Sequence, residues 1–300
     1  MYNFEFTEDM MHDVIITFDN ESQSDDPFAL AYALLSPRLN IKGIIAGHYR
    51  EEEDYDSCRK EAEKIIRMIP GQNPPIYEGS LDTFDYTAEE CSLSDGAARI
   101  IECAARKPIT ILCMTTLTDI ALAIKAAPDI VPNLRIIWAG GGAYPLGADY
   151  EPNIMHDRDA ANYVIQAGCN FWQVPKNIYR KFNVSFAELQ LKVQPQGELG
   201  AYLYQLIMNR AYNPKRPLRY GCYWVLGNLS IVGLMLCEHV FGYKEIPAPL
   251  FSKHCVYVNA GTTKTIRVFE DIDTRFIFED FFAKLTLNTI QQDFAASAKS

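Results

Sequence analysis

The sequence predicts an α/β protein with a doubly wound, mostly parallel sheet and helices on both faces. Short apolar, β-branched runs alternate with segments whose apolar residues recur at helical spacing, beginning with residues 13–18 and 26–35. The 300 residues, 48% hydrophobic and 22% charged, are enough to bury a large core without disulfides or metals. No repeat, low-complexity tract or Pro/Gly/Ser-rich linker interrupts the chain, so we expect a single domain over residues 1–300.

Strands and helices are predicted in strict alternation over the first 174 residues. The predicted strands are 13–18, 41–46, 109–114, 134–139 and 171–174, and the predicted helices are 26–35, 51–68, 119–126 and 157–167. Such alternation favours a parallel sheet covered on both faces. The chain then becomes more helical and aromatic through residues 189–236. A strand pair at 256–259 and 265–270 and a helix at 275–285 are expected to end the fold.

Composition excludes several classes of partner. The 28 Lys and Arg residues against 38 Asp and Glu give a net charge of −10, which repels nucleic acid and anionic membranes. No apolar run approaches the roughly 20 residues of a membrane span, and Met1–Asp13 lacks the apolar stretch of a secretory signal, so we expect a cytoplasmic protein. The eight cysteines form no C-x-x-C pair and are expected to be reduced core thiols rather than disulfides or zinc ligands.

An acidic loop follows the first predicted strand. It carries Asp19, Glu21, Asp25 and Asp26 within eight residues. Ligands bind at the carboxyl ends of strands in such sheets, and several hard oxygen ligands there suit calcium or magnesium. The alternative is a solvated turn whose last aspartate caps the following helix.

This loop resembles the first motif of the inosine-uridine type nucleoside hydrolases, D-x-D-x-x-x-D-D, with Glu21 in place of the second aspartate. Further matches occur in the family's order over nearly the whole chain. Leu117–Ala123 resembles L-T-N-x-A-x-A, Ile136–Gly142 resembles the apolar strand closed by M-G-G, Glu151–Asp157 resembles E-F-N-x-x-x-D, Val174–Asn177 corresponds to P-L-D, and Leu226–Leu229 falls at H-D-P.

The resemblance implies a calcium-dependent hydrolase that cleaves the N-glycosidic bond of a ribonucleoside or a related ribosyl compound. It implies calcium ligands at Glu21, Asp26, the backbone carbonyl of Thr118 and the side chain of Asn228, with Glu21 also acting as the general base. The implied substrate-binding residues are Asp25, His48, Glu151, Asn153 and Asn177. The expected partners are a small-molecule nucleoside and further copies of the chain, in a homodimer or homotetramer.

Each of these roles has a structural alternative. Thr118 and Asp157 are also suited to capping helices, and Glu151 and Asn153 to forming a turn. Three aromatic residues, Tyr220, Tyr223 and Trp224, are suited either to stacking on a nucleobase or to packing in a core or an interface.

Three departures from the family pattern concern the chemistry. Glu21 is one methylene longer than aspartate, Asn228 removes a negative charge from the cation shell, and Gly227 stands where the family often has a histidine that helps protonate the departing base. Tyr223 and His48 are candidates to replace that histidine. The alternative function is therefore a noncatalytic or weakly catalytic nucleoside- or sugar-binding member of the same fold.

Overall fold

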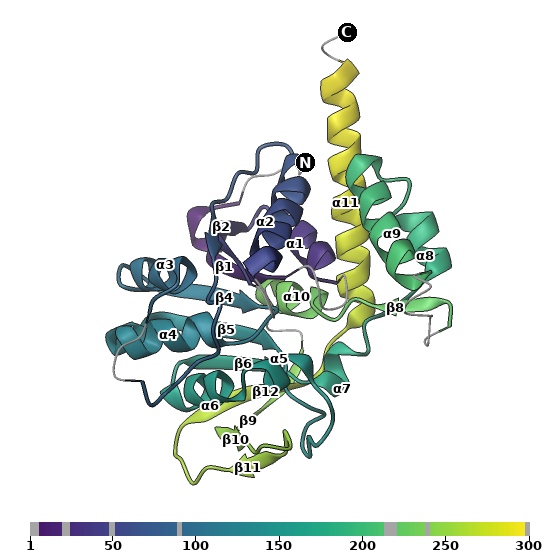
Figure 1. Ribbon diagram of the computed structural model, residues 1–300. Coiled ribbons are helices and arrows are strands. Elements are labelled where there is room, and N and C mark those ends of the chain that lie inside the picture. The colour runs from purple at the N-terminus through teal and green to yellow at the C-terminus, as the bar shows by residue number, and fades with distance from the viewer. Residues whose placement is uncertain are drawn as a thin grey trace.

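The computed structural model describes residues 6–19, 25–47, 52–88, 92–212, 221–237 and 241–297. In this part of the chain a central eight-stranded sheet has the order β3-β2-β1-β4-β5-β6-β12-β9 and is parallel except for the edge strand β9 (Figure 1). Its strands are β1 (His12–Phe18), β2 (Leu39–Ala46), β3 (Ile76–Glu78), β4 (Ile109–Cys113), β5 (Leu134–Ala139), β6 (Asn170–Val174), β9 (Gly242–Pro247) and β12 (Thr265–Asp271). The doubly wound α/β class predicted from the sequence is confirmed.

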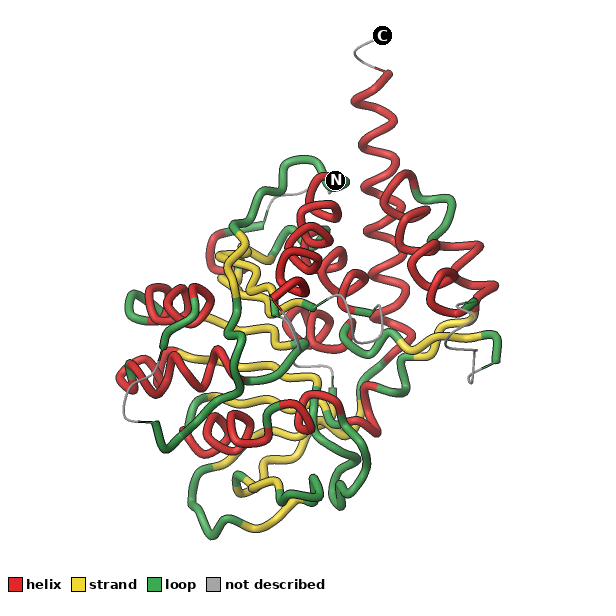
Figure 2. The backbone as a smooth tube through the Cα atoms, in the orientation of Figure 1, coloured by secondary structure: helices red, strands yellow, loops and turns green. Residues whose placement is uncertain are grey.

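Helices flank the sheet on both sides, with the strands between them (Figure 2). The helices are α1 (Asp26–Leu34), α2 (Glu52–Arg67), α3 (Asp95–Ala104), α4 (Thr118–Ala126), α5 (Pro152–His156), α6 (Arg158–Ala167), α7 (Lys176–Tyr179), α8 (Phe186–Lys192), α9 (Gly197–Ala211), α10 (Leu229–Cys237) and α11 (Thr274–Ser297). Two 3-10 helices cover Glu8–Met10 and Pro128–Asn133. Helices α3, α4 and α6 pack along one face, and α1, α2, α10 and α11 form the other layer (Figure 1).

Strand β1 explains how two cores arise from one sheet. Val14, Ile16 and Phe18 belong to the core beneath α1 and α2, whereas Ile15 belongs to the core beneath α3 and α4. Successive side chains of a strand point to opposite faces, so a strand buried on both faces needs an uninterrupted apolar run. This arrangement holds the carboxyl end of β1 rigidly between two packed layers.

The C-terminal region differs from the sequence prediction in its pairing. The strands β11 (Tyr257–Asn259) and β12 do not pair with each other: β11 pairs with β10 (Pro249–Phe251), and β12 lies between β6 and β9. Apolar side chains explain the central position, because Ile266 and Val268 pack in one core and Phe269 in the other. The predicted hairpin at 256–259 and 265–270 is therefore wrong.

The last helix is longer than predicted. The apolar residues Phe278, Phe281 and Phe282 of α11 are buried in the core shared with α1 and α10, while its far end projects beyond the other elements (Figure 1). Phe294 on that end is 73% exposed. Packing of these aromatic rings accounts for the first half of the helix, and in the second half Gln292 Nε2 donates to the Met68 carbonyl at 3.0 Å.

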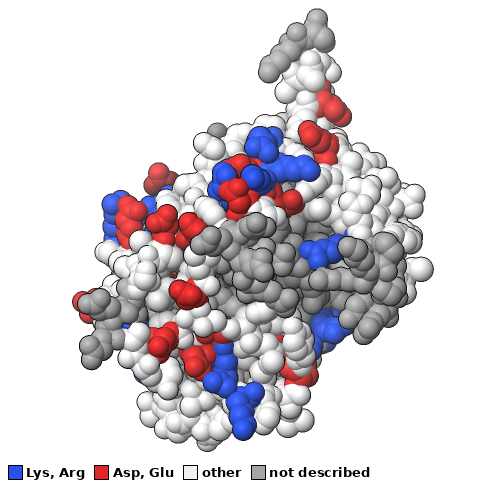
Figure 3. Space-filling model, in the orientation of Figure 1, with Lys and Arg blue, Asp and Glu red and all other residues white. Residues whose placement is uncertain are grey.

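Charged side chains on the surface are mixed in sign. On the face shown in Figure 3, basic and acidic side chains lie interspersed. Along α2, Arg59 pairs with Asp56 and Glu63 at 3.0 and 2.5 Å. None of the helices in the described ranges combines the length and apolar character of a membrane span.

Candidate active site

The candidate site lies at the carboxyl ends of β1, β4 and β5. The loop after β1 contributes Asp25, the segment after β4 contributes Met114, and the β5–α6 connection contributes Glu151 and Asn153. With the turn before α10 these segments enclose a small pocket. Its lining consists of Asp25, Met114, Ala139, Glu151, Pro152, Asn153, Tyr179, Val225 and Asn228. This is the sheet edge at which ligands bind in open α/β folds.

Asn228 joins the two adjacent aspartates of the acidic loop. Its backbone N–H donates to Asp25 Oδ2 at 3.1 Å, and its side-chain Nδ2 donates to Asp26 Oδ1 at 2.6 Å. The other oxygen of Asp26 accepts the backbone N–H of Asp19 at 3.0 Å. All three aspartates are buried, and Asp26 is only 1% exposed. A segment more than 200 positions away along the chain therefore closes the acidic loop.

The buried carboxylates concentrate negative charge at this point. Burial raises the pKa of Asp25 to about 6. Burial also raises the pKa of Asp26 well above its usual range, and the charges of Asp19 and Asp25 add to this effect. A desolvated carboxylate beside like charges is costly to ionise. A bound cation would offset that cost.

Glu151 and Asn153 are held by backbone groups from several elements. Glu151 caps α5 and accepts N–H bonds from Gly141 at 3.1 Å, Asn153 at 3.3 Å and Ile154 at 3.0 Å. Burial raises the pKa of Glu151 although these three donors favour its carboxylate. Asn153 Nδ2 donates to the carbonyls of Met114 and Ala139 at 3.2 and 2.9 Å, which ties the ends of β4 and β5 together.

Gly141 allows the main chain to reach Glu151. Its φ of +88° lies in the left-handed region, and an added Cβ would lie 2.0 Å from Gln173 Nε2. Only glycine fits such a position without strain. The glycine turn after β5 therefore serves close approach of the backbone to an acidic side chain.

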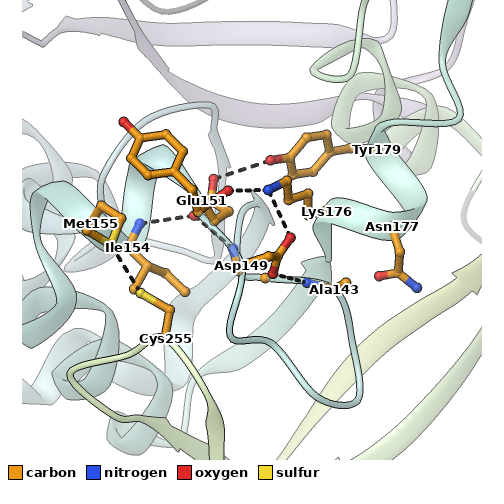
Figure 4. Close-up of polar contacts among 12 residues, drawn as sticks. Ala143, Asp149, Glu151, Ile154, Met155, Lys176, Asn177, Tyr179 and Cys255 are labelled. Atoms are coloured by element: carbon orange, nitrogen blue, oxygen red, sulfur yellow. Dashed lines mark hydrogen bonds and ion pairs between the residues drawn. The ribbon is translucent and has the colours of Figure 1, made fainter.

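Two predicted site residues lie away from the pocket. Thr118 starts α4, and its hydroxyl donates to Asp157 Oδ2 at 2.6 Å; in this segment Met114 lines the pocket instead. The amide of Asn177 binds the backbone N–H and carbonyl of Tyr144 at 3.0 and 3.3 Å and points away from Glu151 (Figure 4). Asp157 caps α6 through Ala160 N–H, the structural role that its sequence context favours.

Comparison with known proteins decides the family. The family model described as inosine-uridine preferring nucleoside hydrolase matches residues 14–274. The chain belongs to this nucleoside hydrolase family. Its members hydrolyse N-glycosidic bonds.

Relatives and solved structures agree with this membership. The chain is 23% identical to a probable uridine nucleosidase 2 of Arabidopsis thaliana over 64% of this chain and 68% of that protein. It is 27% identical to the pyrimidine-specific ribonucleoside hydrolase RihB of Escherichia coli over 51% and 56%. It thus spans between about half and two thirds of the curated relatives it matches. A purine-preferring ribonucleoside hydrolase from Gardnerella vaginalis has the same fold, with a TM-score of 0.73 at 17% identity, covering 92% of this chain and 99% of that one.

The donor set of this nucleoside hydrolase suits a hard cation. The carboxylate of Asp26 and the amide of Asn228 offer oxygen ligands next to the buried carboxylates of Asp19 and Asp25, and hard oxygen ligands are what calcium or magnesium prefers. No group of three or more His, Cys, Asp or Glu side chains within the described ranges is arranged to hold a metal ion. The further implied ligand Glu21 lies outside the described residues, as do His48 and Tyr220.

Aromatic residues form a wall beside the pocket, and sequence reasoning named two of them. A second cavity of about 190 Å³ shares Pro152, Tyr179 and Val225 with the first. It is lined by Tyr150, Pro152, Lys176, Tyr179, Arg180, Tyr223, Trp224 and Val225. The two residues named are Tyr223 and Trp224, which stand close together in the sequence, whereas Tyr150 and Tyr179 were missed. The signal for Tyr179 was its place in the segment that follows β6, at the sheet edge where ligands are expected.

Proposed function

We propose that this chain hydrolyses the N-glycosidic bond of a ribonucleoside or related ribosyl compound with the help of bound calcium. The observation that carries the proposal is the convergence of five polar residues in one buried site at the strand ends. These are Asp25, Asp26, Glu151, Asn153 and Asn228. Each lies at a position that corresponds to a functional residue of the family pattern.

Calcium would be held by Glu21, Asp26, the backbone carbonyl of Thr118 and Asn228. Each carboxylate oxygen has two lone pairs, so the hydrogen bonds to Asp26 leave acceptor capacity for a cation. The Thr118 hydroxyl donates to Asp157, so the proposed ligand at this position is the backbone carbonyl alone. When bound, calcium lowers the pKa of water and thereby supplies the nucleophile.

The remaining residues orient the sugar and accept a proton from the attacking water. Asp25, Glu151 and Asn153 are suited to binding ribose hydroxyls, because they are buried and fixed by backbone hydrogen bonds. Glu21 is the proposed general base, and His48 is proposed to contact the sugar or the base edge. Departure of the base leads, so positive charge builds on the ribosyl ring before water adds.

The aromatic cavity is the proposed site of the nucleobase. At about 190 Å³ it is smaller than the roughly 300–1,000 Å³ of sites for drug-sized ligands, which suits it to one part of a ligand such as a ring system. Stacking on Tyr223 and Trp224 tolerates different bases, since every base has a π-face. The names of the relatives are consistent with this tolerance, because they specify uridine, pyrimidines or purines.

The test is turnover of uridine, inosine and p-nitrophenyl riboside by the purified chain, with calcium and with chelator. We expect calcium-dependent release of the leaving group and its loss in Asp26→Ala. The control is Asp159→Ala, which removes an aspartate that pairs with Arg158 on the surface of α6. Equal turnover in Asp26→Ala and wild type would overturn the proposed role of the acidic loop.

One observation favours nucleoside or sugar binding without efficient catalysis as a second candidate. Asn228 directs an N–H group at Asp26, and Gly227 beside it has no side chain to donate to a leaving base. Under this alternative none of the three substrates is cleaved, yet ribose or a nucleoside raises the melting temperature.

A further inference from the structure

Tyr179 stands at the junction of the two cavities. It is the last residue of α7, immediately beyond the carboxyl end of β6. Its ring lines the polar pocket with Asp25 and Glu151, and it also lines the aromatic cavity with Trp224. If the sugar occupies the first and the base the second, the bond between them passes Tyr179.

The Tyr179 hydroxyl is available to turn toward a ligand. It donates to Glu151 Oε1 over 3.4 Å, a long hydrogen bond that is drawn as a dashed line in Figure 4. Glu151 is already fixed by three backbone N–H groups, so it does not depend on this bond for its position. Burial and the nearby carboxylates of Glu151 and Asp25 raise the pKa of Tyr179, and the phenol keeps its proton at neutral pH.

The same side chain explains why residue 227 is glycine. A Cβ on Gly227 would lie 2.9 Å from Tyr179 Cδ2 and 3.2 Å from the Tyr179 carbonyl oxygen. Contacts this short do not occur without displacement of the tyrosine. The tyrosine ring thus occupies the space into which a side chain at 227 would extend, and no histidine fits there.

We propose that the Tyr179 hydroxyl donates a hydrogen bond to the substrate beside the scissile bond and thereby supports departure of the leaving group. This inference rests on the proposed hydrolysis. As the C1′–N bond breaks, its electron pair moves to the base nitrogen, and the Tyr179 O–H stabilises the growing negative charge without giving up its proton. The water oxygen bonds to C1′, and the water proton passes through the general base to the departing base.

The experiment compares Tyr179→Phe with wild type on natural and activated substrates. Removal of one preorganised donor costs roughly 10²-fold in rate, so kcat/KM for uridine and inosine should fall about 10²-fold. p-Nitrophenyl riboside, whose leaving group needs no help, should retain its kcat/KM within about threefold of wild type. The control is Tyr202→Phe, which removes a half-buried hydroxyl that donates from α9 to Glu61 of α2, and it should leave kcat/KM for both kinds of substrate unchanged.

A second variant tests the geometric half of the inference. Gly227→Ala places a methyl group against the Tyr179 ring and should produce the same selective loss on uridine and inosine, with unchanged folding by circular dichroism. Equal losses on natural and activated substrates in both variants, or no loss on either substrate, would overturn the inference while leaving the proposed function standing. Wild type that cleaves none of the three substrates would overturn both.

Discussion

Asp157 anchors three segments of the chain, and its removal has a calculable cost. Its Oδ1 accepts Ala160 N–H at 2.9 Å and caps α6, while Oδ2 accepts Phe84 N–H at 2.8 Å and the Thr118 hydroxyl at 2.6 Å. The carboxylate therefore joins α6, the segment before α3 and the first turn of α4 in a buried position. We expect Asp157→Ala to destabilise the fold without touching the pocket.

The magnitude follows from the groups that lose partners. Loss of the helix cap costs about 1 kcal/mol, and the buried Phe84 N–H left without an acceptor costs about 1–3 kcal/mol. Thr118 retains Thr116 as a hydroxyl partner at 2.9 Å. Burial raises the pKa of Asp157, so removal of the charge recovers part of the loss. The expected decrease in the free energy of unfolding is about 2–3 kcal/mol at pH 7.

Urea unfolding measured by circular dichroism checks this value. Asp159→Ala is the matched control on the same helix, and its change should stay within about 0.5 kcal/mol because that side chain is exposed. A double-mutant cycle with Thr118→Ala should give a coupling energy of at least about 0.5 kcal/mol. A loss below about 1 kcal/mol in Asp157→Ala, or no coupling to Thr118, would refute the reasoning.

Three further predictions concern the pocket. In the presence of chelator, the free energy of unfolding of Asp25→Asn should exceed that of wild type by up to about 3 kcal/mol at pH 7. The pKa of Asp25 is raised to about 6 in the folded state, so wild type loses stability as pH rises from about 4 to 6. Chemical unfolding at pH 4 and 7 measures the difference between the two proteins, and a difference that does not change with pH contradicts the prediction. Asn228→Asp adds a carboxylate to the cation site and should tighten calcium binding by about tenfold in calorimetry, whereas unchanged affinity would place the cation elsewhere. Trp224→Ala should raise KM for uridine about fivefold to a hundredfold through lost stacking, and an unchanged KM would remove the base from the aromatic cavity.

The sequence was most informative where local pattern and burial agree. The five predicted strands up to residue 174 lie within one or two residues of β1, β2, β4, β5 and β6, because each is an apolar run buried on both faces. Helix α3 escaped prediction although Ser94 caps it, since its apolar residues at 97, 100 and 104 follow an acidic, turn-rich segment. Strand β3 is only three residues long and carries no periodicity.

The sequence predicted which loops form the candidate site, but not all the contacts of their side chains. The positions of Asp25 and Asp26 follow from the end of β1, and the structure brings Asn228 to them from a distant segment. Side-chain direction was beyond the sequence pattern: the Asn177 amide binds the backbone N–H and carbonyl of Tyr144. The contact of Tyr179 with Gly227 depends on tertiary packing between segments that no local pattern relates.

Two elements from the C-terminal part of the sequence complete the core. Strand β12 lies inside the sheet, and α11 packs on α1. The rings of Phe28 and Tyr32 contact Phe281, and the Tyr32 hydroxyl donates to Asp280, 248 positions away. During synthesis α1 emerges well before α11, so the apolar surface of α1 that α11 covers stays exposed until α11 has been made. Until β12 pairs with β6, the backbone N–H and C=O groups on that edge of β6 have no strand partner. A product whose synthesis stops before β12 would expose the apolar surface of α1 and the open edge of β6, and both features favour aggregation.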